Sequence, residues 1–117
     1  MRYLMLIHQD ENDLGGTPDE MKALYADWGA FNEALAKAKG STPGERMQPA
    51  SAATTVRIRS GKTSVVDGPY SDTKEQLGGY YFIEADNLDE AIKWAERCPA
   101  SRYGGIEIRP IVPAGKY

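Results

Sequence analysis

The chain has 117 residues, of which 41% are hydrophobic and 26% charged, so it suits one globular domain and leaves no room for a second. The formal net charge is −3 and the basic residues are scattered, which argues against binding to nucleic acid. A single cysteine, Cys98, excludes an internal disulfide, and with one histidine, His8, no dedicated metal site and no cofactor are predicted. A mixed metal site of His8 and carboxylates stays open.

The first apolar run covers residues 3–7, far short of the roughly 20 residues that span a bilayer. The N-terminal region also lacks the basic, apolar and cleavage segments of a signal peptide. We therefore predict a cytoplasmic protein that does not associate with membranes.

Residues 3–7 are apolar at every position, which predicts a strand buried on both faces in the middle of a sheet. Polar residues 9–13 and the glycines at 15 and 16 mark a loop. Thr17, Pro18 and Glu20 form a strong helix start, and apolar residues at spacings of three and four then predict a helix to about Lys39. We interpret this apolar stripe as core packing.

Residues 41–44 have turn composition, and residues 46–50 could form a short edge strand. Alternation over residues 54–59, a Ser60-Gly61 turn and residues 63–66 predict a β-hairpin. Residues 80–83 form a second doubly apolar strand. A helix follows, capped by Asn87 and Glu90 and ended by Pro99, and residues 106–109 form the last strand.

This order predicts an α+β fold: a ferredoxin-like split βαβ antiparallel sheet with an extra hairpin, in which the doubly apolar strands are central. Two helices can cover only one face of such a sheet. The apolar residues of the other face need another cover, and a second copy of the chain is the simplest one. We therefore predict a homodimer packed sheet to sheet.

The densest group of candidate site residues follows the hairpin, where Asp67, Gly68, Pro69 and Tyr70 turn the chain sharply. In one interpretation Asp67 only satisfies amides of its own turn. In the other, the turn directs Asp67 into a cleft between sheet and helix, as a general base or hydrogen-bond acceptor.

Residues 71–76 are predicted to form one helical turn, whose amides, with Lys74, could bind an anion or could serve for capping alone. His8 ends the first strand, and histidine is suited to proton transfer near neutral pH, although a structural role stays open. Tyr80 and Tyr81 point to opposite faces, so only one can line a given pocket. Arg57 could bind a carboxylate or could simply be solvated.

The sequence resembles the DGPF subgroup of the YCII-related family, in which residues 67–70 give the subgroup its name and Tyr70 replaces the usual phenylalanine. The resemblance extends to residues 2–7, 48–57, 73–81, 88–91 and 106–111. It implies a dimeric α+β barrel with a site near Asp67. Relatives of this subgroup tend to be encoded beside extracytoplasmic-function sigma factors, which suggests a regulatory setting.

More distant YCII relatives resemble enzymes that act on small aromatic or chlorinated molecules through a histidine and aspartate pair. Their histidine follows a proline at the start of the first helix. Here Pro18 is followed by Asp19, Glu20 and Met21, so the paired mechanism does not carry over. His8 would have to substitute for it from a different element.

Three hypotheses follow. The first is a small-molecule enzyme or ligand-binding protein, in which Asp67 and His8 are the proton-transfer groups. Its pocket residues would be Tyr70, Lys74, Tyr81 and Arg57. The second is a non-catalytic module that regulates transcription through protein contacts. The third, a heme- or quinone-handling monooxygenase, has no ligand motif in the sequence to support it.

Overall fold

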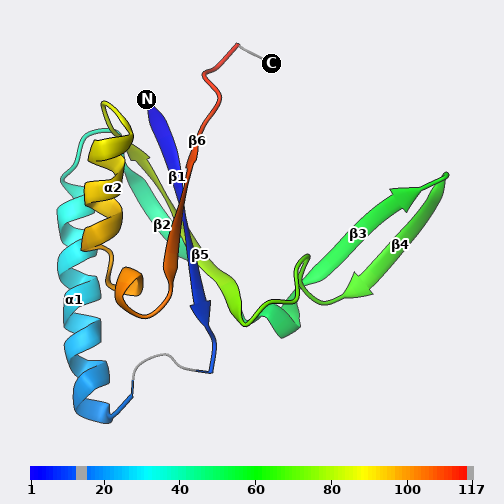
Figure 1. Cartoon of the computed structure of the whole chain (residues 1–117), viewed down its shortest axis with the longest axis horizontal. Helices are drawn as coiled ribbons and strands as arrows, with labels where there is room; N and C mark the ends of the chain where they lie inside the picture. The colour runs from blue at the N-terminus through cyan, green and yellow to red at the C-terminus, as the bar shows by residue number, and fades with distance from the viewer. Residues whose placement is uncertain (13–15, 116–117) are drawn as a thin grey trace.

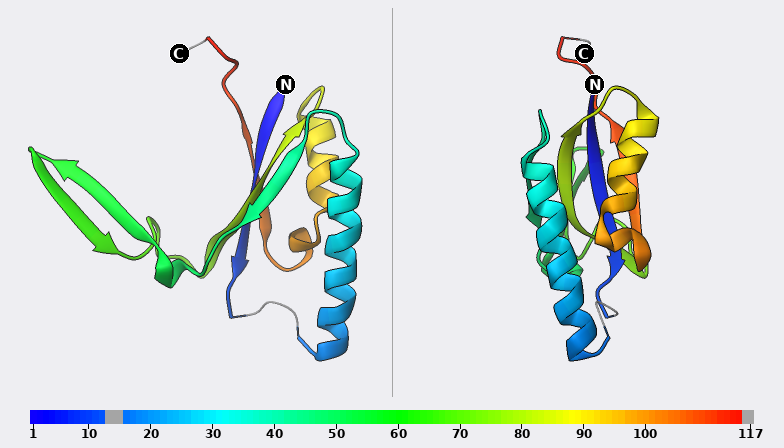
Figure 2. Two further views of the ribbon diagram at one scale, coloured as in Figure 1. Left: turned by 180° about the vertical axis from the view of Figure 1, so that it is seen from behind. Right: turned by 90° about the vertical axis from the view of Figure 1, so that its left-hand side faces the viewer.

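The computed structural model describes residues 1–12 and 16–115, and its main feature is a four-stranded antiparallel sheet (Figure 1). The strand order is β2-β5-β1-β6, with bounds Thr42–Arg46 for β2, Glu75–Glu84 for β5, Arg2–Asp10 for β1 and Gly105–Pro110 for β6. Two helices, α1 (Pro18–Ala36) and α2 (Leu88–Arg97), lie on one side of this sheet (Figure 1 and the left view of Figure 2). The predicted ferredoxin-like α+β fold is confirmed.

The two strands that are apolar at every position lie side by side in the middle of the sheet, as predicted. In the register of β1 and β5, Leu4 lies opposite Phe82 and Leu6 opposite Tyr80. Alternate residues of these strands are buried on the helix-covered face: Tyr3, Met5, Ile7 and Ile83. Full burial of a side chain such as Met5 stabilises the fold by about 1.5 to 3 kcal/mol.

Both helices begin where the sequence predicts. The Thr17 hydroxyl accepts a hydrogen bond from the Glu20 amide at 3.2 Å, and Asn87 Oδ1 accepts one from the Glu90 amide at 3.0 Å. α1 ends at Ala36, slightly before the predicted end near Lys39. Within the described part of the chain, neither helix has the length and apolar character needed to cross a bilayer.

An aromatic cluster joins the helices to the sheet. Phe31 of α1 is buried and makes edge-to-face contacts with three other rings, whose centroids lie 5.5 to 6.3 Å away: Trp28, Tyr81 and Trp94. Such pairs contribute about 0.5 to 1.5 kcal/mol each beyond the area that they bury. The apolar stripe of α1 therefore packs into the core at this end of the helix.

The predicted hairpin forms, but it stands apart from the four-stranded sheet. Strands β3 (Thr54–Arg59) and β4 (Lys62–Asp67) pair only with each other and make a separate two-stranded sheet, here called the arm. The arm projects on the side away from both helices (Figures 1 and 2). At its base, the Gly68 amide donates to the Ala53 carbonyl at 2.8 Å and the Thr55 hydroxyl donates to the Gly68 carbonyl at 2.9 Å.

Three local predictions differ from the structure. Residues 42–46, expected mainly as a turn, form the edge strand β2, whereas residues 50–52 form a short 3₁₀ turn in place of the expected strand end. Residues 71–76 form no helical turn; the chain is irregular to Lys74 and enters β5 at Glu75. The loop predicted from Gln9 is shorter because β1 extends to Asp10, and residues 13–15 of that loop lie outside the described residues.

Candidate functional site

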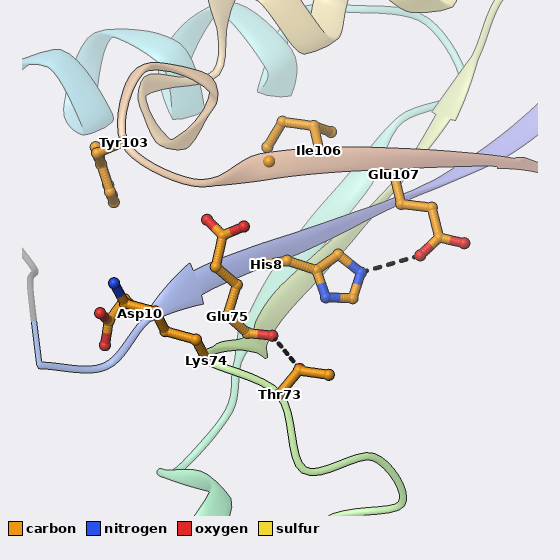
Figure 3. A pocket seen from close by; sticks show the side chains of 9 residues that line it. His8, Asp10, Thr73, Lys74, Glu75, Tyr103, Ile106 and Glu107 are labelled. Carbon is orange, nitrogen blue, oxygen red and sulfur yellow. Dashed lines mark hydrogen bonds and ion pairs between the residues drawn. The ribbon is translucent and has the colours of Figure 1, made fainter.

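His8 lies on the uncovered face of the sheet, where β1 pairs with β6. Its neighbour across the strands is Gly105, which has no side chain to occupy the space beside the imidazole. The ring reaches diagonally to Glu107, and its Nε2 atom lies 3.0 Å from Glu107 Oε1 (Figure 3). The sheet register thus holds a partly exposed histidine against a carboxylate.

Glu107 has a second partner, because Arg109 Nη1 donates to its Oε2 atom at 3.0 Å. The Arg109 guanidinium and, after it, the hydrogen bond from His8 lower the pKa of the Glu107 carboxyl below its usual range. A carboxylate can only accept hydrogen bonds, so His8 Nε2 must be the donor at neutral pH. A neutral His8 then carries a lone pair on Nδ1, for which no partner is found among the described residues.

A β-bulge shapes the other side of the site. The register of β1 and β5 shifts between Ile7 and His8, so that Ile7 faces Gly79 while His8 faces Leu77. Gly78 is the extra residue, and bulges of this kind redirect the side chains that follow. The shift brings Leu77 and Glu75 to the same sheet face as His8.

These elements surround an open cleft of about 810 Å³ at the end of the uncovered face (Figure 3). The polar side chains lining it include His8, Asp10, Thr73, Lys74, Glu75 and Glu107, together with Tyr103. Lys74 lies on the loop between the arm and β5, and the neighbouring Thr73 hydroxyl donates to the Glu75 carbonyl at 2.7 Å. The cleft therefore combines a histidine, a lysine and several carboxylates, which is a set suited to moving a proton.

Of the residues predicted for the site, the structure brings together only His8 and Lys74. Arg57 and Tyr70 lie on the arm and at its base, where the guanidinium carbon of Arg57 is 5.2 Å from the centroid of the Tyr70 ring. The Tyr70 side chain is 82% exposed. Both residues pack against each other and neither lines the cleft.

Asp67 ends β4 opposite Thr54 and is exposed. It lines neither the His8 cleft nor a smaller one of about 390 Å³ beside it, whose wall includes Pro69 and Asp72. Within one chain, His8 and Asp67 therefore do not share a cavity. The catalytic role predicted for Asp67 stays a prediction.

Tyr81 lies on the helix-covered face, away from the cleft. Its hydroxyl donates to Asn32 Oδ1 of α1 at 2.6 Å, and burial raises the pKa of Tyr81 above its usual value. Burial also raises the pKa of Cys98 to about 11, so this thiol is protonated at neutral pH. Cys98 belongs to the buried core, and Tyr81 is partly buried and packs against that core.

Sequence reasoning missed Glu107, the closest partner of His8. The alternation of residues 106–109 indicates that Glu107 faces away from the core, yet nothing local indicates which residue of β1 it meets. That pairing depends on the register of β1 and β6. Among the described residues, no group of three or more His, Cys, Asp and Glu side chains could hold a metal ion.

The fold and the cleft define a small ferredoxin-like α+β protein with a partly exposed histidine and carboxylate pair. Residues 1–114 match the YCII-related domain, and the chain belongs to this family. It is similar to an uncharacterised protein of Rhizobium meliloti (strain 1021), with 34% identity over 114 residues, which are 95% of this chain and 92% of that protein.

Among solved structures, the chain is similar to 5-chloro-2-hydroxyhydroquinone dehydrochlorinase from Burkholderia phenoliruptrix AC1100, determined in complex with 2,5-dihydroxybenzoquinone. The TM-score is 0.52, with 17% sequence identity, and the match covers 96% of this chain and 94% of that one. At this identity the likeness shows a common fold and carries no activity to this chain.

Proposed function

We propose that this YCII-related protein binds a small hydroxylated organic molecule in the His8 cleft and exchanges a proton with it. One observation carries the proposal: Glu107, held by Arg109, fixes Nε2 of His8 as the donor at 3.0 Å. The other ring nitrogen, Nδ1, then carries the lone pair that can accept a proton. The hydrogen bond at Nε2 fixes the orientation of the ring and so the direction of this lone pair. This is the arrangement by which a carboxylate orients a histidine for general base chemistry.

Lys74 has a complementary role in this proposal. When a hydroxyl group gives its proton to His8, the oxygen becomes negatively charged, and an ammonium group in the same cleft stabilises that charge. Asp10 and Glu75 also line the cleft and disfavour a molecule that arrives as an anion. A neutral phenol or enol is the ligand class that fits both conditions. The dihydroxybenzoquinone bound by the structural neighbour is a hydroxylated ring of related chemistry.

A nitrocatechol tests the proposal directly, because its absorption band moves to longer wavelength when a hydroxyl group loses its proton. At a pH where the free compound is protonated, binding to the wild-type protein should produce the band of the ionised form. His8→Ala should bind without that change, and Lys74→Met should weaken binding. Binding that shows no band shift, or a shift that persists in His8→Ala, would falsify the proton-transfer role.

Within the family, we assign the chain to the DGPF subgroup on the basis of Asp67, Gly68, Pro69 and Tyr70, and we place the protein in the cytoplasm.

A second candidate function is the non-catalytic regulatory module linked to extracytoplasmic-function sigma factors. The exposed arm favours it, because unburied apolar side chains suit protein contacts. His8→Ala separates the two, since it should abolish the nitrocatechol band shift if the cleft transfers a proton and leave partner binding intact if the protein is a module.

A further inference from the structure

We propose that the arm is exchanged between two copies of this chain: in a homodimer, the arm of each copy lies across the uncovered sheet face of the other and closes its His8 cleft. This inference rests on the proposed function, because the cleft that the arm closes is the one proposed to bind the ligand. The site is then incomplete in a single chain.

The arm has one apolar face that nothing in its own chain covers. Val56 and Val65 lie opposite each other in the β3–β4 register, and Ile58 follows on the same face. Their side chains are 59%, 63% and 63% exposed, respectively. A two-stranded hairpin with no packed face is only marginally stable in water. The arm therefore needs a surface from outside the chain.

The sheet also has an apolar face that nothing in its own chain covers among the described residues, on the side opposite the helices. Its side chains form an apolar strip across β1 and β5, consisting of Leu4, Leu6, Leu77, Tyr80 and Phe82. None of these five is fully buried, and Leu77 is 40% exposed. The strip reaches His8, which lies directly opposite Leu77. Whatever covers the strip therefore also closes one side of the cleft.

The shape of the chain identifies a second copy as the cover. The molecule measures 48 × 43 × 19 Å and its radius of gyration is 16.4 Å, whereas a compact chain of this length has one of about 13 Å. The excess comes from the arm, which extends on the same side as the uncovered sheet face (Figure 1). A two-fold axis makes each contact occur twice, so one symmetric dimer covers both arms and both strips.

Charge favours the same pairing. The arm carries three basic side chains, Arg57, Arg59 and Lys62, against one carboxylate, Asp67, although the whole chain has a formal net charge of −3. The rest of the chain is therefore acidic, and Asp10, Glu75 and Glu107 place negative charge in the cleft itself. These basic side chains lie on the polar face of the arm, where Arg57 pairs with Ser64 and Arg59 with Lys62. They attract an acidic second copy toward the arm, while the apolar face makes the contact.

Val65→Asp tests the exchange, with Ser64→Asp as its matched control. Both add one negative charge to β4, but Val65 lies on the apolar face and Ser64 lies opposite Arg57 on the polar face. Neither side chain is buried within the chain, so the fold should tolerate both changes. Sedimentation should show a wild-type dimer that Val65→Asp weakens by at least about tenfold, because burying an unpaired carboxylate is unfavourable. Ser64→Asp should dimerise like the wild type.

The nitrocatechol affinity measures closure of the cleft. It should fall in Val65→Asp at concentrations where that variant is monomeric, and Ser64→Asp should keep the wild-type affinity.

A wild-type monomer at high concentration would overturn the exchange, as would a Val65→Asp dimer of unchanged affinity. A Val65→Asp monomer that binds nitrocatechol as well as the wild type would show that the arm does not complete the cleft. Failure of the proposed function looks different: the dimer would respond to Val65→Asp while the wild type showed no binding that depends on His8.

Discussion

The helix-covered face of the sheet and the arm are built from similar apolar strand residues, but they are buried to opposite extents. Met5 and Ile83 lie almost entirely out of contact with solvent, whereas Val56 and Val65 are more than half exposed. The difference lies in what covers them: α1 and α2 pack over the first group, and no part of the described chain packs over the second. An apolar pattern thus shows that a face needs a cover without showing which chain supplies it.

The candidate site lies where the helix-covered core and the uncovered side of the sheet meet. His8 follows the apolar positions of β1 on the uncovered face, and its polar partners come from the ends of β5 and β6. The covered core fixes the backbone positions of these strands, while the uncovered side leaves their polar groups accessible. Variants on the two sides should therefore affect different measurable properties.

The largest expected effect is on the covered side. Ile83→Ala removes a side chain that is only 1% exposed, and it should lower the free energy of unfolding by about 2 to 5 kcal/mol because it leaves a cavity among packed neighbours. Val65→Ala on the arm is the control, and in dilute, monomeric protein it should change this free energy by less than about 0.5 kcal/mol. Urea unfolding measures both. Similar losses for the two variants would mean that the arm is packed within its own chain.

The covered side is also the part that the sequence predicts best. The doubly apolar strands and the Thr17 and Asn87 caps are local patterns, and each is found where it is expected. The Ser60-Gly61 turn of the arm is also a local pattern and is found as expected. β2 was missed because its sequence, TPGER, contains turn residues and forms a strand only by pairing with β5. The helical turn expected at residues 71–76 fails for a related reason, since β1 continues to Asp10 and pairs with Glu75.

The candidate site was less predictable because it depends on register. His8 and Lys74 could be selected by residue type, and the structure places both on the cleft. Glu107 could not, since its contact with His8 follows from which residues of β1 and β6 lie opposite each other. The Gly78 bulge adds a second non-local shift, which changes the face to which Glu75 points.

A second, smaller loss of stability is expected at Gly104, where the covered and uncovered sides of the sheet meet. A Cβ atom on Gly104 would clash with the His8 carbonyl oxygen and lie 3.2 Å from the Gln9 Cα atom, and both are backbone atoms that cannot rotate away. Gly104→Ala should therefore cost about 1 to 3 kcal/mol and push β6 away from β1.

Gly105→Ala is the matched control for Gly104→Ala, because nothing lies within 4 Å of the added atom. Thermal unfolding compares the two glycine variants. The nitrocatechol band shift is compared between Gly104→Ala and the wild type, because Gly105 itself lines the cleft opposite His8. If both variants behave alike, the close approach at Gly104 does not position the site.

The smallest effect concerns charge on the uncovered side, at Glu107. Because its folded-state pKa is lowered, this carboxylate stabilises the fold above the ordinary glutamate pKa of about 4.3, and the contribution is lost as the pH falls through the folded-state value. The two partners are unequal, since the Arg109 hydrogen bond lowers this pKa more than the His8 hydrogen bond does. Arg109→Gln should therefore raise the pKa of Glu107 further toward its usual value than His8→Gln does.

Carbon NMR of the Glu107 carboxyl group during acid titration measures both shifts, with Lys37→Gln as a distant control that should leave them unchanged. A larger shift in His8→Gln would reverse the order of the two partners, and His8 would then be the main anchor of the carboxylate. The expected order instead makes Arg109 the residue that lowers the pKa of Glu107 most. An ionised Glu107 fixes the His8 proton on Nε2, so the base offered to a ligand is Nδ1.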